Sequence, residues 1–598
     1  MNRVLLSASP QLRKILGLAL LALLAVGVAP FLLDIYTVNI LVRSLLYACV
    51  ALTVDILWGY TGILTFGQSA FFGIGAYACG LAFSHLGLSP TVAILAFVGG
   101  LAVAAATAAL VGWLAFGYGV SPIYVSVVTL VLPIVVTQIL FSGGTFTGSS
   151  SGLSGFDTVD LDLETWFWIA GGALVILTTA AWIFVRSDAG RLLVAIRENE
   201  QRCEYLGINT SLLKTMILVA AALVAAAAGY AYAAYTDVIA PELAGFVFGT
   251  ELVIWVALGG RGTLIGPVVG AIVIDLVSAY LSGSLPFVWK LVIGLAFVLV
   301  IVVLPQGFVP LLRKGWRRLS RSAPPAEPIS ALRPAPGASR RHSTAGTSLA
   351  LQHVSRHYGS LKVLAGIDLS VRPGELLSLV GPNGAGKTTL IRCIADGHER
   401  SGGRVLVQGN DIGRRSPQRC VAFGIGRKFQ TANVFETLTV AECLRLARHR
   451  LERPSWWARG STLSVPEAAL NVISATGLDR ELGAAVTHLS HGMKQALELA
   501  MVLALEPSVL LLDEPTAGLT KPERALIGGI LTTLAREHAL SILLVEHDLD
   551  FVREISSRVV VLHQGRIVLD GTVAEVVDSA LVRTIYAGEE HAVTGAAR

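Results

Sequence analysis

A glycine-rich stretch in the second half of the chain carries the residues of a phosphate-binding loop. Residues 381–388 read GPNGAGKT, which fits the pattern G-x-x-x-x-G-K-[ST] at every fixed position. The glycines allow backbone N–H groups to surround phosphate oxygens. Lys387 can then reach the terminal phosphates, and the hydroxyl of Thr388 can ligate Mg²⁺. This stretch therefore predicts the binding of a nucleoside triphosphate together with Mg²⁺.

Two adjacent carboxylates further along the chain could act on the bound phosphates. Residues 508–512 read SVLLL, an apolar strand, and Asp513 and Glu514 follow at its end. We expect Asp513 to hold Mg²⁺, directly or through a water, and Glu514 to take a proton from the attacking water. Paired carboxylates can also belong to a solvated turn, but their position downstream of a phosphate-binding loop favours phosphoryl transfer.

Three further polar residues are candidates for the same chemistry. His547 follows the apolar run 542–545 and could contact the γ-phosphate. Gln430 lies between the phosphate-binding loop and the carboxylates in sequence, and is a candidate for metal or water contact. Ser490 fits the N-cap of an amphipathic helix that runs to Leu505. The exposed N-terminus of that helix would suit an anion supplied by another subunit.

The stretches around these residues predict an α/β domain. Residues 375–380 are typical of a short apolar strand, and residues 390–394 open a helix. The phosphate-binding loop therefore lies between a strand and a helix N-terminus, as its chemistry requires. Strand-like and helix-like stretches go on alternating through the second half of the chain. We expect this half to be an α/β P-loop NTPase domain.

The composition indicates that much of the chain lies in lipid. Of its 598 residues, 54% are hydrophobic and only 15% are charged, against about 25% charged in an ordinary soluble domain. The formal net charge of +5 is small for this length, so we expect no nucleic-acid partner. The six cysteines show no C-x-x-C spacing, and we expect them to be reduced thiols.

The first half contains repeated apolar stretches of about 20 residues, the length that crosses a bilayer. We predict spans at residues 15–33, 38–58, 61–83, 90–116, 120–142, 165–185, 214–236, 250–282 and 286–308. Glycines interrupt the apolar pattern at 59–68 and 259–262, and we interpret 250–282 as two short crossings. The first span is too long for a signal peptide. The predicted fold class is a multi-domain chain, with a polytopic all-α membrane domain before the NTPase domain.

Lysine and arginine residues predict the orientation of this domain. Arg3, Arg13 and Lys14 place the N-terminus in the cytoplasm. The basic loop 186–214 is then cytoplasmic as well, whereas the loop 143–164 has four acidic residues and no lysine or arginine, as an outside loop can. Counting the region 250–282 as two crossings leaves the NTPase domain in the cytoplasm.

Two features of this half have two explanations each. Asp55, Asp275 and Arg261 could lie at helix ends and reach the interface, or they could be functional charges inside the membrane. The amphipathic loop 190–208 could be a solvated loop. It could also form a short helix that ends near Gly207 and docks into a partner domain.

A linker rich in Pro, Ala, Ser and Arg lies between the two halves, from residue 319 to 347. It has no apolar periodicity, so we expect a flexible or polyproline-like tether whose arginines could touch anionic lipid. The predicted domains are a cytoplasmic N-terminus (1–14), a transmembrane domain (15–312), a linker (313–347) and the NTPase domain (348–598).

The NTPase half resembles the ATP-binding cassette (ABC) ATPases over nearly all of its length. The phosphate loop, Gln430 of the Q-loop, the signature segment 489–495, the Asp513–Glu514 pair and the switch residue His547 occur in the order of that family. The resemblance implies ATP and Mg²⁺ as cofactors. The implied ATP contacts are Tyr358 at the adenine, and Gly381, Asn383, Gly384, Ala385, Gly386, Lys387, Thr388, Thr389, Ser490 and Gly492 at the phosphates. The implied metal site is Thr388, Gln430 and Asp513, and the implied catalytic residues are Glu514, His547 and Gln430.

Two segments depart from the ABC pattern. The usual signature L-S-G-G-Q reads L-S-H-G-M here, with His491 and Met493 at the changed positions. The D-loop, residues 517–520, reads AGLT and lacks its common Asp. Ser490 and Gly492 remain the expected contacts to the γ-phosphate of ATP bound by the opposite monomer.

The membrane half resembles the permeases of the hydrophobic (branched-chain) amino acid uptake family. The resemblance is carried by WGYTG at 58–62, by FGQSAFFGIGAY at 66–77, and by the loop 190–208. That loop is similar to the coupling loop of importers and contains Glu200 and Gly207. Features that lean toward the urea and short-chain amide branch of the family lie at residues 254–265, 424–430 and 489–492.

Together the resemblances imply an ATP-driven importer subunit of the inner (plasma) membrane, with a permease fused to its ATPase. The expected substrates are branched-chain or hydrophobic amino acids, or urea and short-chain amides. The expected partners are a second permease and a second ATPase, in a heterodimer or a homodimer, a periplasmic or extracellular substrate-binding protein, and membrane lipid. Two alternatives stay open, namely an ABC exporter of a small molecule and a membrane-anchored P-loop signalling ATPase.

Overall fold

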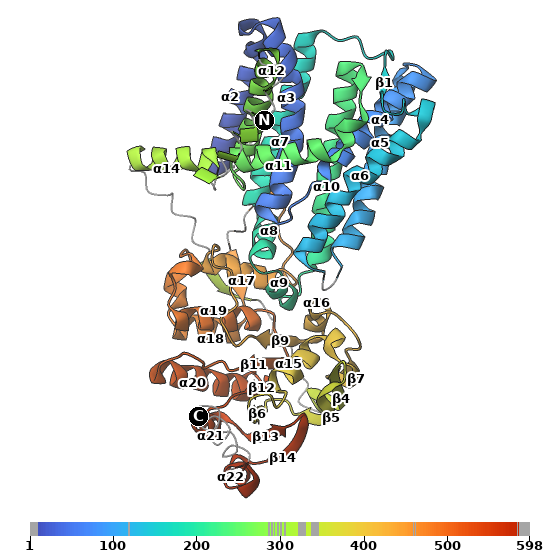
Figure 1. The fold of residues 1–598 in the computed structure, drawn as a ribbon. Coiled ribbons are helices and arrows are strands. Elements are labelled where there is room, and N and C mark those ends of the chain that lie inside the picture. Colours follow the sequence, from blue (N-terminus) through green and yellow to red (C-terminus); the bar gives the residue numbers. More distant parts are fainter. Residues whose placement is uncertain are drawn as a thin grey trace. The chain divides into compact units, whose positions relative to one another are not determined.

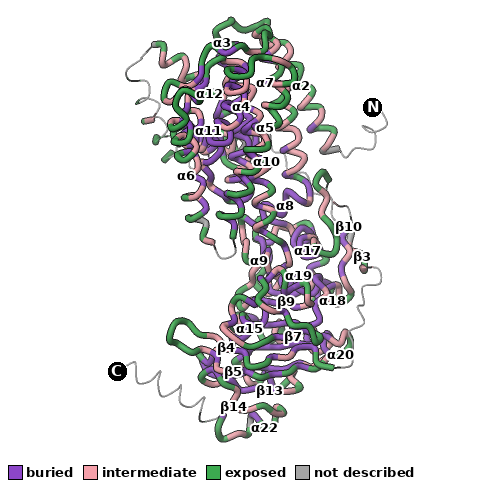
Figure 2. Tube along the Cα trace, turned by 90° about the vertical axis from the view of Figure 1, so that its right-hand side faces the viewer, coloured by how far each residue is buried: buried purple, intermediate pink, exposed green. Residues whose placement is uncertain are grey.

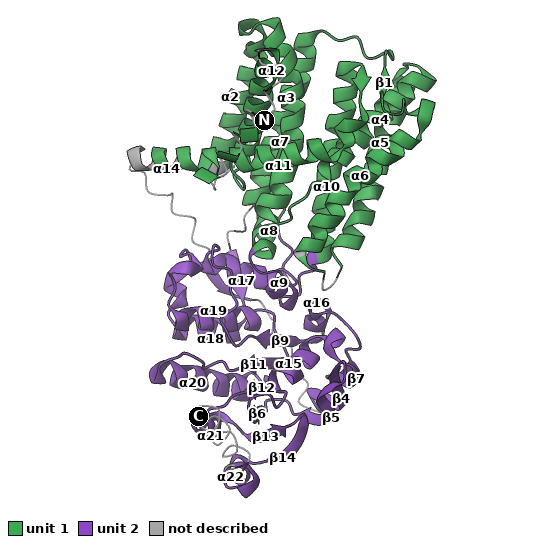
Figure 3. Ribbon diagram, viewed as in Figure 1, with its two compact units in different colours: residues 1–197, 211–324, 455–459 green, residues 198–210, 325–454, 460–598 purple. Residues whose placement is uncertain are grey.

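The protein divides into two compact units (Figure 3). The first contains residues 1–197, 211–324 and 455–459, and the second contains residues 198–210, 325–454 and 460–598. The computed structural model describes residues 10–117, 120–284, 307–320, 331–335, 346–458 and 462–582, together with single residues and pairs between 288 and 303 and residues 460 and 584. The predicted span at 286–308 lies largely outside the described residues.

The first unit is built of helices, with one short antiparallel pair of strands, β1 (Leu153–Ser154) and β2 (Val238–Ile239) (Figure 1). Its long helices are α2 (Pro10–Leu32), α3 (Ile35–Asp55), α4 (Gln68–Leu86), α5 (Pro90–Ala115), α6 (Pro122–Ser142), α7 (Leu163–Arg186), α10 (Thr210–Thr236) and α12 (Ile265–Ser284). The shorter ones are α8 (Asp188–Glu198), α11 (Phe246–Gly259) and α14 (Phe308–Ser320). Within the described residues, eight helices are long and apolar enough to cross a membrane.

Burial differs sharply between the central and the outer helices of this unit (Figure 2). In the most hydrophobic part of α3, 83% of the residues are buried, against 6% in α2. The exposed side chains of α2 and α5 include large apolar ones such as Leu21 and Ile94. An apolar exterior around a buried centre is the pattern of helices that face lipid.

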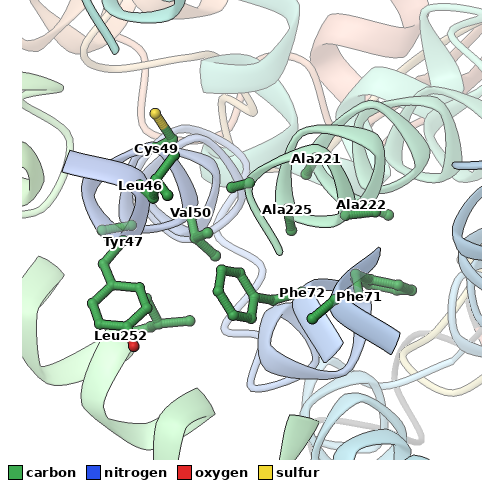
Figure 4. Close-up of a cluster of buried hydrophobic side chains, with 14 of the residues drawn as sticks. Leu46, Tyr47, Cys49, Val50, Phe71, Phe72, Ala221, Ala222, Ala225 and Leu252 are labelled. Carbon is green, nitrogen blue, oxygen red and sulfur yellow. The ribbon is translucent and has the colours of Figure 1, made fainter. Parts of the chain in front are cut away.

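Small residues allow α4 and α10 to approach closely. Figure 4 shows the buried cluster at this place, in which Tyr47 of α3 lies beside Leu252 of α11, and Phe72 of α4 lies between Tyr47 and the alanines of α10. The ring centroids of Tyr47 and Phe72 are 5.8 Å apart. A Cβ atom at Gly75 would lie 1.9 Å from the carbonyl oxygen of Ala226, so only glycine fits at this helix crossing.

The predicted break near residues 259–262 is confirmed. Helix α11 ends at Gly259 and α12 begins at Ile265. The buried Asp55 carboxylate accepts hydrogen bonds from the backbone N–H groups of Gly262 (2.6 Å) and Leu264 (3.0 Å). These donors satisfy a carboxylate that would otherwise be costly to bury. Asp55 therefore stabilises the break and does not reach outward from a helix end.

The second acidic residue in a membrane helix is also paired inside the unit. Asp275 lies in the middle of α12 and is 8% exposed. Arg43 Nη2 lies 2.9 Å from its Oδ1, Arg43 Nε donates to its Oδ2 at 3.2 Å, and Ser44 Oγ donates to Oδ2 at 2.6 Å. The charge of Asp275 is thus neutralised by Arg43 between α3 and α12, so Asp275 does not extend to the membrane interface. The third charged residue, Arg261, has its guanidinium 5.1 Å from the ring centroid of Trp58.

The third span begins later than predicted. Helix α3 continues as a π-helical turn, Ile56–Tyr60, and α4 starts only at Gln68, so the predicted start at residue 61 is wrong. Residues 61–67 are apolar enough to resemble part of a span. However, Gly62 has a φ angle of +79°, which ends the helical conformation.

The loop 190–208 forms two helices, α8 and α9 (Glu200–Tyr205), so the prediction of a short helix is confirmed. The side chain of Asn199 caps α9 by accepting a hydrogen bond from the backbone N–H of Arg202 (2.8 Å). Gly207 follows with a φ angle of +82°, which is typical of a helix C-terminus. Helix α8 belongs to the first unit and α9 to the second.

The second unit contains two main sheets (Figure 1). The six-stranded sheet has the order β14-β13-β6-β12-β11-β9, and the four-stranded sheet the order β5-β4-β7-β8. The strands are β4 (Leu349–Tyr358), β5 (Leu361–Val371), β6 (Leu376–Val380), β7 (Gly402–Val407), β8 (Asn410–Asp411), β9 (Ile425–Lys428), β11 (Val509–Asp513), β12 (Ser541–Val545), β13 (Arg558–His563) and β14 (Arg566–Gly571). The longer helices are α15 (Lys387–Ala395), α17 (Val440–Arg448), α18 (Glu467–Ala475), α19 (His491–Leu503) and α20 (Lys521–Glu537).

Parallel pairing brings the ends of the central strands to one edge of the larger sheet. Strands β13, β6, β12, β11 and β9 run parallel, and only β14 is antiparallel. Every residue of β6, β11 and β12 is buried, as in a parallel sheet covered on both faces. The prediction of an α/β domain is confirmed.

Part of the predicted flexible linker is ordered. Residues Ala331–Pro334 form β3, which pairs in parallel with β10 (Thr462–Val465). The prediction failed here because four residues are too few to show a strand period in the sequence. Helix α14 also reaches into the predicted linker, whose other residues lie mainly outside the described ones.

We expect Gly75→Ala to destabilise the first unit, because the added methyl group would overlap the Ala226 carbonyl. Overpacking of this kind costs about 1–3 kcal/mol. Thermal unfolding of the full chain in detergent measures the effect. Gly99→Ala in α5 is the matched control, because nothing lies within 4 Å of its Cβ position. Equal stability of the two variants would contradict the close approach of α4 and α10.

Candidate active site

The phosphate-binding loop joins β6 to α15, as predicted. Its glycines have positive φ angles, +152° at Gly381, +78° at Gly384 and +105° at Gly386. A Cβ atom at Gly381 would lie 2.1 Å from the carbonyl oxygen of Leu562. The loop therefore requires glycine both for its backbone conformation and for space.

The lysine of this loop is held inside its curve. Lys387 Nζ donates hydrogen bonds to the carbonyl oxygens of Gly381 (2.6 Å) and Pro382 (3.0 Å). Lys387 is also the first residue of α15, so its ammonium and the N-terminal N–H groups of the helix lie in the same place. This arrangement suits the binding of phosphate oxygens. The predicted contacts Asn383, Ala385 and Thr389 belong to the same continuous segment.

Two oxygen ligands, one from the start of α15 and one from the end of β11, meet at this loop. Thr388 Oγ1 donates a hydrogen bond to Asp513 Oδ1 at 3.4 Å. Asp513 is the last residue of β11 and is 2% exposed. Burial raises the pKa of its carboxyl above the ordinary value. A hydroxyl and a carboxylate fit the oxygen ligands that Mg²⁺ prefers, and the cation would offset the burial of the carboxylate.

The predicted catalytic residues lie together around one carboxylate. Gln430 Nε2 donates a hydrogen bond to Glu514 Oε2 at 2.8 Å, and His547 Nδ1 lies 3.8 Å from the same oxygen. The backbone N–H of Glu514 donates to the carbonyl oxygen of Val545 (2.9 Å). Glu514 has a φ angle of +46°, which is uncommon for a residue with a side chain and is typical of functional positions. Ligation of Mg²⁺ by Gln430 stays a prediction.

Sequence reasoning missed a third carboxylate at this edge, Glu546. It is 1% exposed, and its Oε1 accepts hydrogen bonds from the hydroxyl (2.6 Å) and the backbone N–H (3.3 Å) of Thr516. Burial raises the pKa of its carboxyl. His547 Nδ1 lies 3.8 Å from Glu546 Oε2 as well as near Glu514. The signal was present in the sequence, because Glu546 directly follows the buried strand β12.

The signature residues lie at the start of α19. Ser490 is the N-cap, and its Oγ accepts a hydrogen bond from the backbone N–H of Met493 (3.3 Å), so the predicted cap is confirmed. A Cβ atom at Gly492 would lie 2.2 Å from Glu523 Oε1. The unusual residue His491 faces the D-loop, with Nε2 3.3 Å from the position of a Cβ at Gly518. Contact of Ser490 and Gly492 with ATP stays a prediction.

The predicted adenine contact is at the end of β4. Tyr358 is 45% exposed, so its ring is accessible. The guanidinium of Arg356 lies 4.3 Å from the ring centroid, and Arg356 Nη2 pairs with Glu399 Oε2 at 2.8 Å. Stacking of Tyr358 on adenine stays a prediction.

In the coupling loop, the most deeply buried residues of α9 are not the predicted residues Glu200 and Gly207. Glu200 opens α9, and Gly207 ends it, with its Cβ position 3.4 Å from Val421 Cγ1. The residues of α9 that the second unit buries most deeply are Arg202 and Cys203, both 0% exposed. A charged residue is rarely buried so completely without a partner.

Two family models match different parts of this sequence. Residues 36–303 match the permease component of the branched-chain amino acid transport system. Residues 364–517 match the ABC transporter model. The two matches lie on either side of the boundary between the membrane half and the NTPase half.

Relatives of the second half are known ABC ATPases. The chain is 30% identical over 249 residues to the high-affinity branched-chain amino acid transport ATP-binding protein BraF of Pseudomonas aeruginosa, which covers 40% of this chain and 98% of the relative. It is 38% identical over 233 residues to the phosphonates import ATP-binding protein PhnC of Alcaligenes faecalis, covering 38% of this chain and 84% of the relative. A solved ATP-binding cassette of an ABC transporter, in its ADP conformation, is 26% identical, with a TM-score of 0.36 and coverage of 41% of this chain and 100% of that chain.

We expect Asp513→Asn to lower Mg²⁺-dependent ATP hydrolysis by roughly 100-fold or more, because the variant lacks the charge that pairs with the metal. The hydrolysis rate is measured as a function of Mg²⁺ concentration. Asp479→Asn, at an exposed position of the same unit, is the control and should leave the rate unchanged. An unchanged Mg²⁺ dependence in Asp513→Asn would show that this carboxylate does not hold the metal.

Proposed function

Since this chain belongs to the ABC transporter family, with a branched-chain-type permease domain joined to an ATP-hydrolysing ABC ATPase domain, we propose that it is an importer subunit for branched-chain amino acids. The permease match and the name of the BraF relative support this substrate class. We place the chain in the plasma membrane, with its ATPase domain in the cytoplasm.

The observation that carries the proposal is that one chain joins a permease domain to an ATPase domain in which Gln430, Glu514 and His547 lie together. A permease alone would need no phosphate-binding loop, and an ATPase alone would need no apolar helices. In this chain, the segment that links α8 to α10 contributes α9 to the ATPase unit. One continuous segment of the permease sequence is therefore part of the fold that hydrolyses ATP.

We assign the hydrolytic roles from the contacts at the sheet edge. Glu514 takes the proton of the attacking water, and Gln430 orients the Glu514 carboxylate through its 2.8 Å hydrogen bond. His547 donates toward the γ-phosphate, from a position 3.8 Å from Glu514. Lys387 and the N–H groups of the loop bind the phosphates. Thr388 and Asp513 would hold Mg²⁺, which when bound would stabilise the charge that develops on the phosphate oxygens.

The signature segment suggests the expected partners. The N-terminus of α19 begins at exposed residues and can bind an anion. We propose that it completes the ATP site of a second ATPase domain, which belongs to a second permease–ATPase pair in a heterodimer or a homodimer. An external substrate-binding protein would deliver the amino acid to the permease side.

Two observations weigh against the alternatives. ABC exporters extend their membrane helices far into the cytoplasm, whereas α8 and α9 have 11 and 6 residues. A signalling ATPase would have no use for a helix of the permease sequence inside its fold. Urea and short-chain amides stay a second substrate class, because the residues at 254–265 favoured that branch.

We expect cells that express this chain with the proteins encoded beside it to take up labelled leucine or valine. Uptake should fall to background in Glu514→Gln, which keeps the nucleotide site but lacks the base. Glu537→Gln, at the end of α20, is the matched control and should transport normally. Uptake of labelled urea in place of leucine would move the substrate to the amide branch. Uptake that is as fast in Glu514→Gln as in the parent chain would contradict ATP-driven import.

A further inference from the structure

Arg202 of α9 carries a buried charge into the ATPase unit. Its side chain and that of Glu498 on α19 are both 0% exposed, and Arg202 Nη1 lies 3.3 Å from Glu498 Oε1. The same guanidinium donates to the backbone carbonyl oxygens of Arg427 (3.2 Å) and Glu498 (3.4 Å). Three contacts from one side chain therefore hold α9 against α19 and the end of β9.

Glu498 also pairs with a second cation and accepts a hydrogen bond from a backbone N–H. Lys428 Nζ lies 3.7 Å from Glu498 Oε2, and the backbone N–H of Phe429 donates to Oε1 at 3.1 Å. Lys428 also donates a hydrogen bond to Gln495. Burial lowers the pKa of both Lys428 and Arg202, and the Glu498 charge opposes that shift. One carboxylate thus pairs with two buried cations, and removing a partner leaves a buried charge less compensated.

The position of Glu498 links this group to the hydrolytic residues. Phe429, which donates to Glu498, directly precedes Gln430, whose amide donates to Glu514. Glu498 also lies about two turns along α19 from the helix start that bears the signature residues. A displacement of Arg202 would therefore act on the Q-loop and on the signature helix through one side chain.

We propose that Glu498 is a positioning residue for ATP hydrolysis. Its ion pair with Arg202 depends on the docking of α9, and its hydrogen bond from Phe429 holds Gln430 against Glu514. The proposal rests on the proposed function, because it assumes that α9 couples the permease to the ATPase. When Arg202 is seated, Glu498 holds Phe429 and hence Gln430 in place. When Arg202 is withdrawn, Glu498 keeps Lys428 and the Phe429 N–H, but it loses the guanidinium that fixes its Oε1, so the Q-loop is held less firmly.

The test measures the kcat and KM of ATP hydrolysis by the full chain in lipid nanodiscs, together with its partner subunits. Arg202→Met is the main variant. It leaves the Lys428–Glu498 pair intact and is therefore less prone to unfold than Glu498→Gln. We expect its kcat to fall about tenfold with KM for ATP changed by less than about twofold, the pattern of a lost interaction that acts only in the transition state. Adding Glu498→Gln to Arg202→Met should lower kcat no further than Glu498→Gln alone, because the two residues act as one unit.

Arg448→Met is the matched control. Arg448 is also a buried arginine of the same unit, and its Nη1 pairs with Glu506 Oε1 at 2.6 Å and donates to the Ala504 carbonyl oxygen at 3.1 Å. Among the described residues, its hydrogen bonds and ion pairs reach neither α9 nor Gln430. Its kcat should stay within about twofold of the parent, even where thermal unfolding shows a similar loss of stability. An equal fall in kcat in Arg448→Met, or a normal kcat in Arg202→Met, would overturn the proposal. Because hydrolysis is measured without transported substrate, a wrong substrate assignment would leave this result unaffected.

Discussion

The carboxyl ends of parallel strands meet at one edge of a sheet, and the chemistry of this protein depends on that constraint. Strand β6 leads into the phosphate-binding loop, β11 ends in Asp513 and Glu514, and β12 is followed by Glu546 and His547. Since β6, β12 and β11 are neighbours in the sheet, residues more than 150 positions apart are brought together by backbone pairing alone. The side chains then need only short reaches to contact one another.

Neutralisation of buried charge is the second constraint, and it acts in both units. Asp55 is satisfied by the backbone N–H groups of the break after α11, and Asp275 is paired with Arg43. In the ATPase unit, Glu498 forms ion pairs with Arg202 and Lys428. An unpaired charge at any of these places would cost several kcal/mol. Each pair therefore specifies which segments must lie together. The Arg202–Glu498 pair holds α9, a helix of the permease sequence, within the ATPase unit.

Much of the fold and of the site could be predicted because their signals are local. The phosphate-binding loop, Asp513, Glu514 and His547 each stand at the end of a short apolar stretch that reads as a strand, which indicated a common location. Gln430 was a candidate only from its place in the sequence between the loop and the carboxylates. The glycine break after α11 and the helix in the 190–208 loop were equally visible in short stretches of sequence.

The errors and omissions concern features that depend on distant partners. Arg202 and Glu498 are 296 residues apart, and nothing near either residue indicates the other. Strand β3 exists only because β10 pairs with it, although it lies in a stretch with linker composition. The late start of α4 depends on the backbone conformation at Gly62, which hydrophobicity does not report.

The direction of transport tests the central claim most directly. The chain, together with its partner subunits, is reconstituted in liposomes that hold labelled leucine and the substrate-binding protein inside, and ATP is added outside only. Complexes whose ATPase domains face outward can use this ATP. Import toward the ATPase side predicts that leucine leaves the lumen after ATP addition, and that Glu514→Gln abolishes this release. Accumulation of external leucine inside the liposomes under the same conditions would identify an exporter and contradict the account.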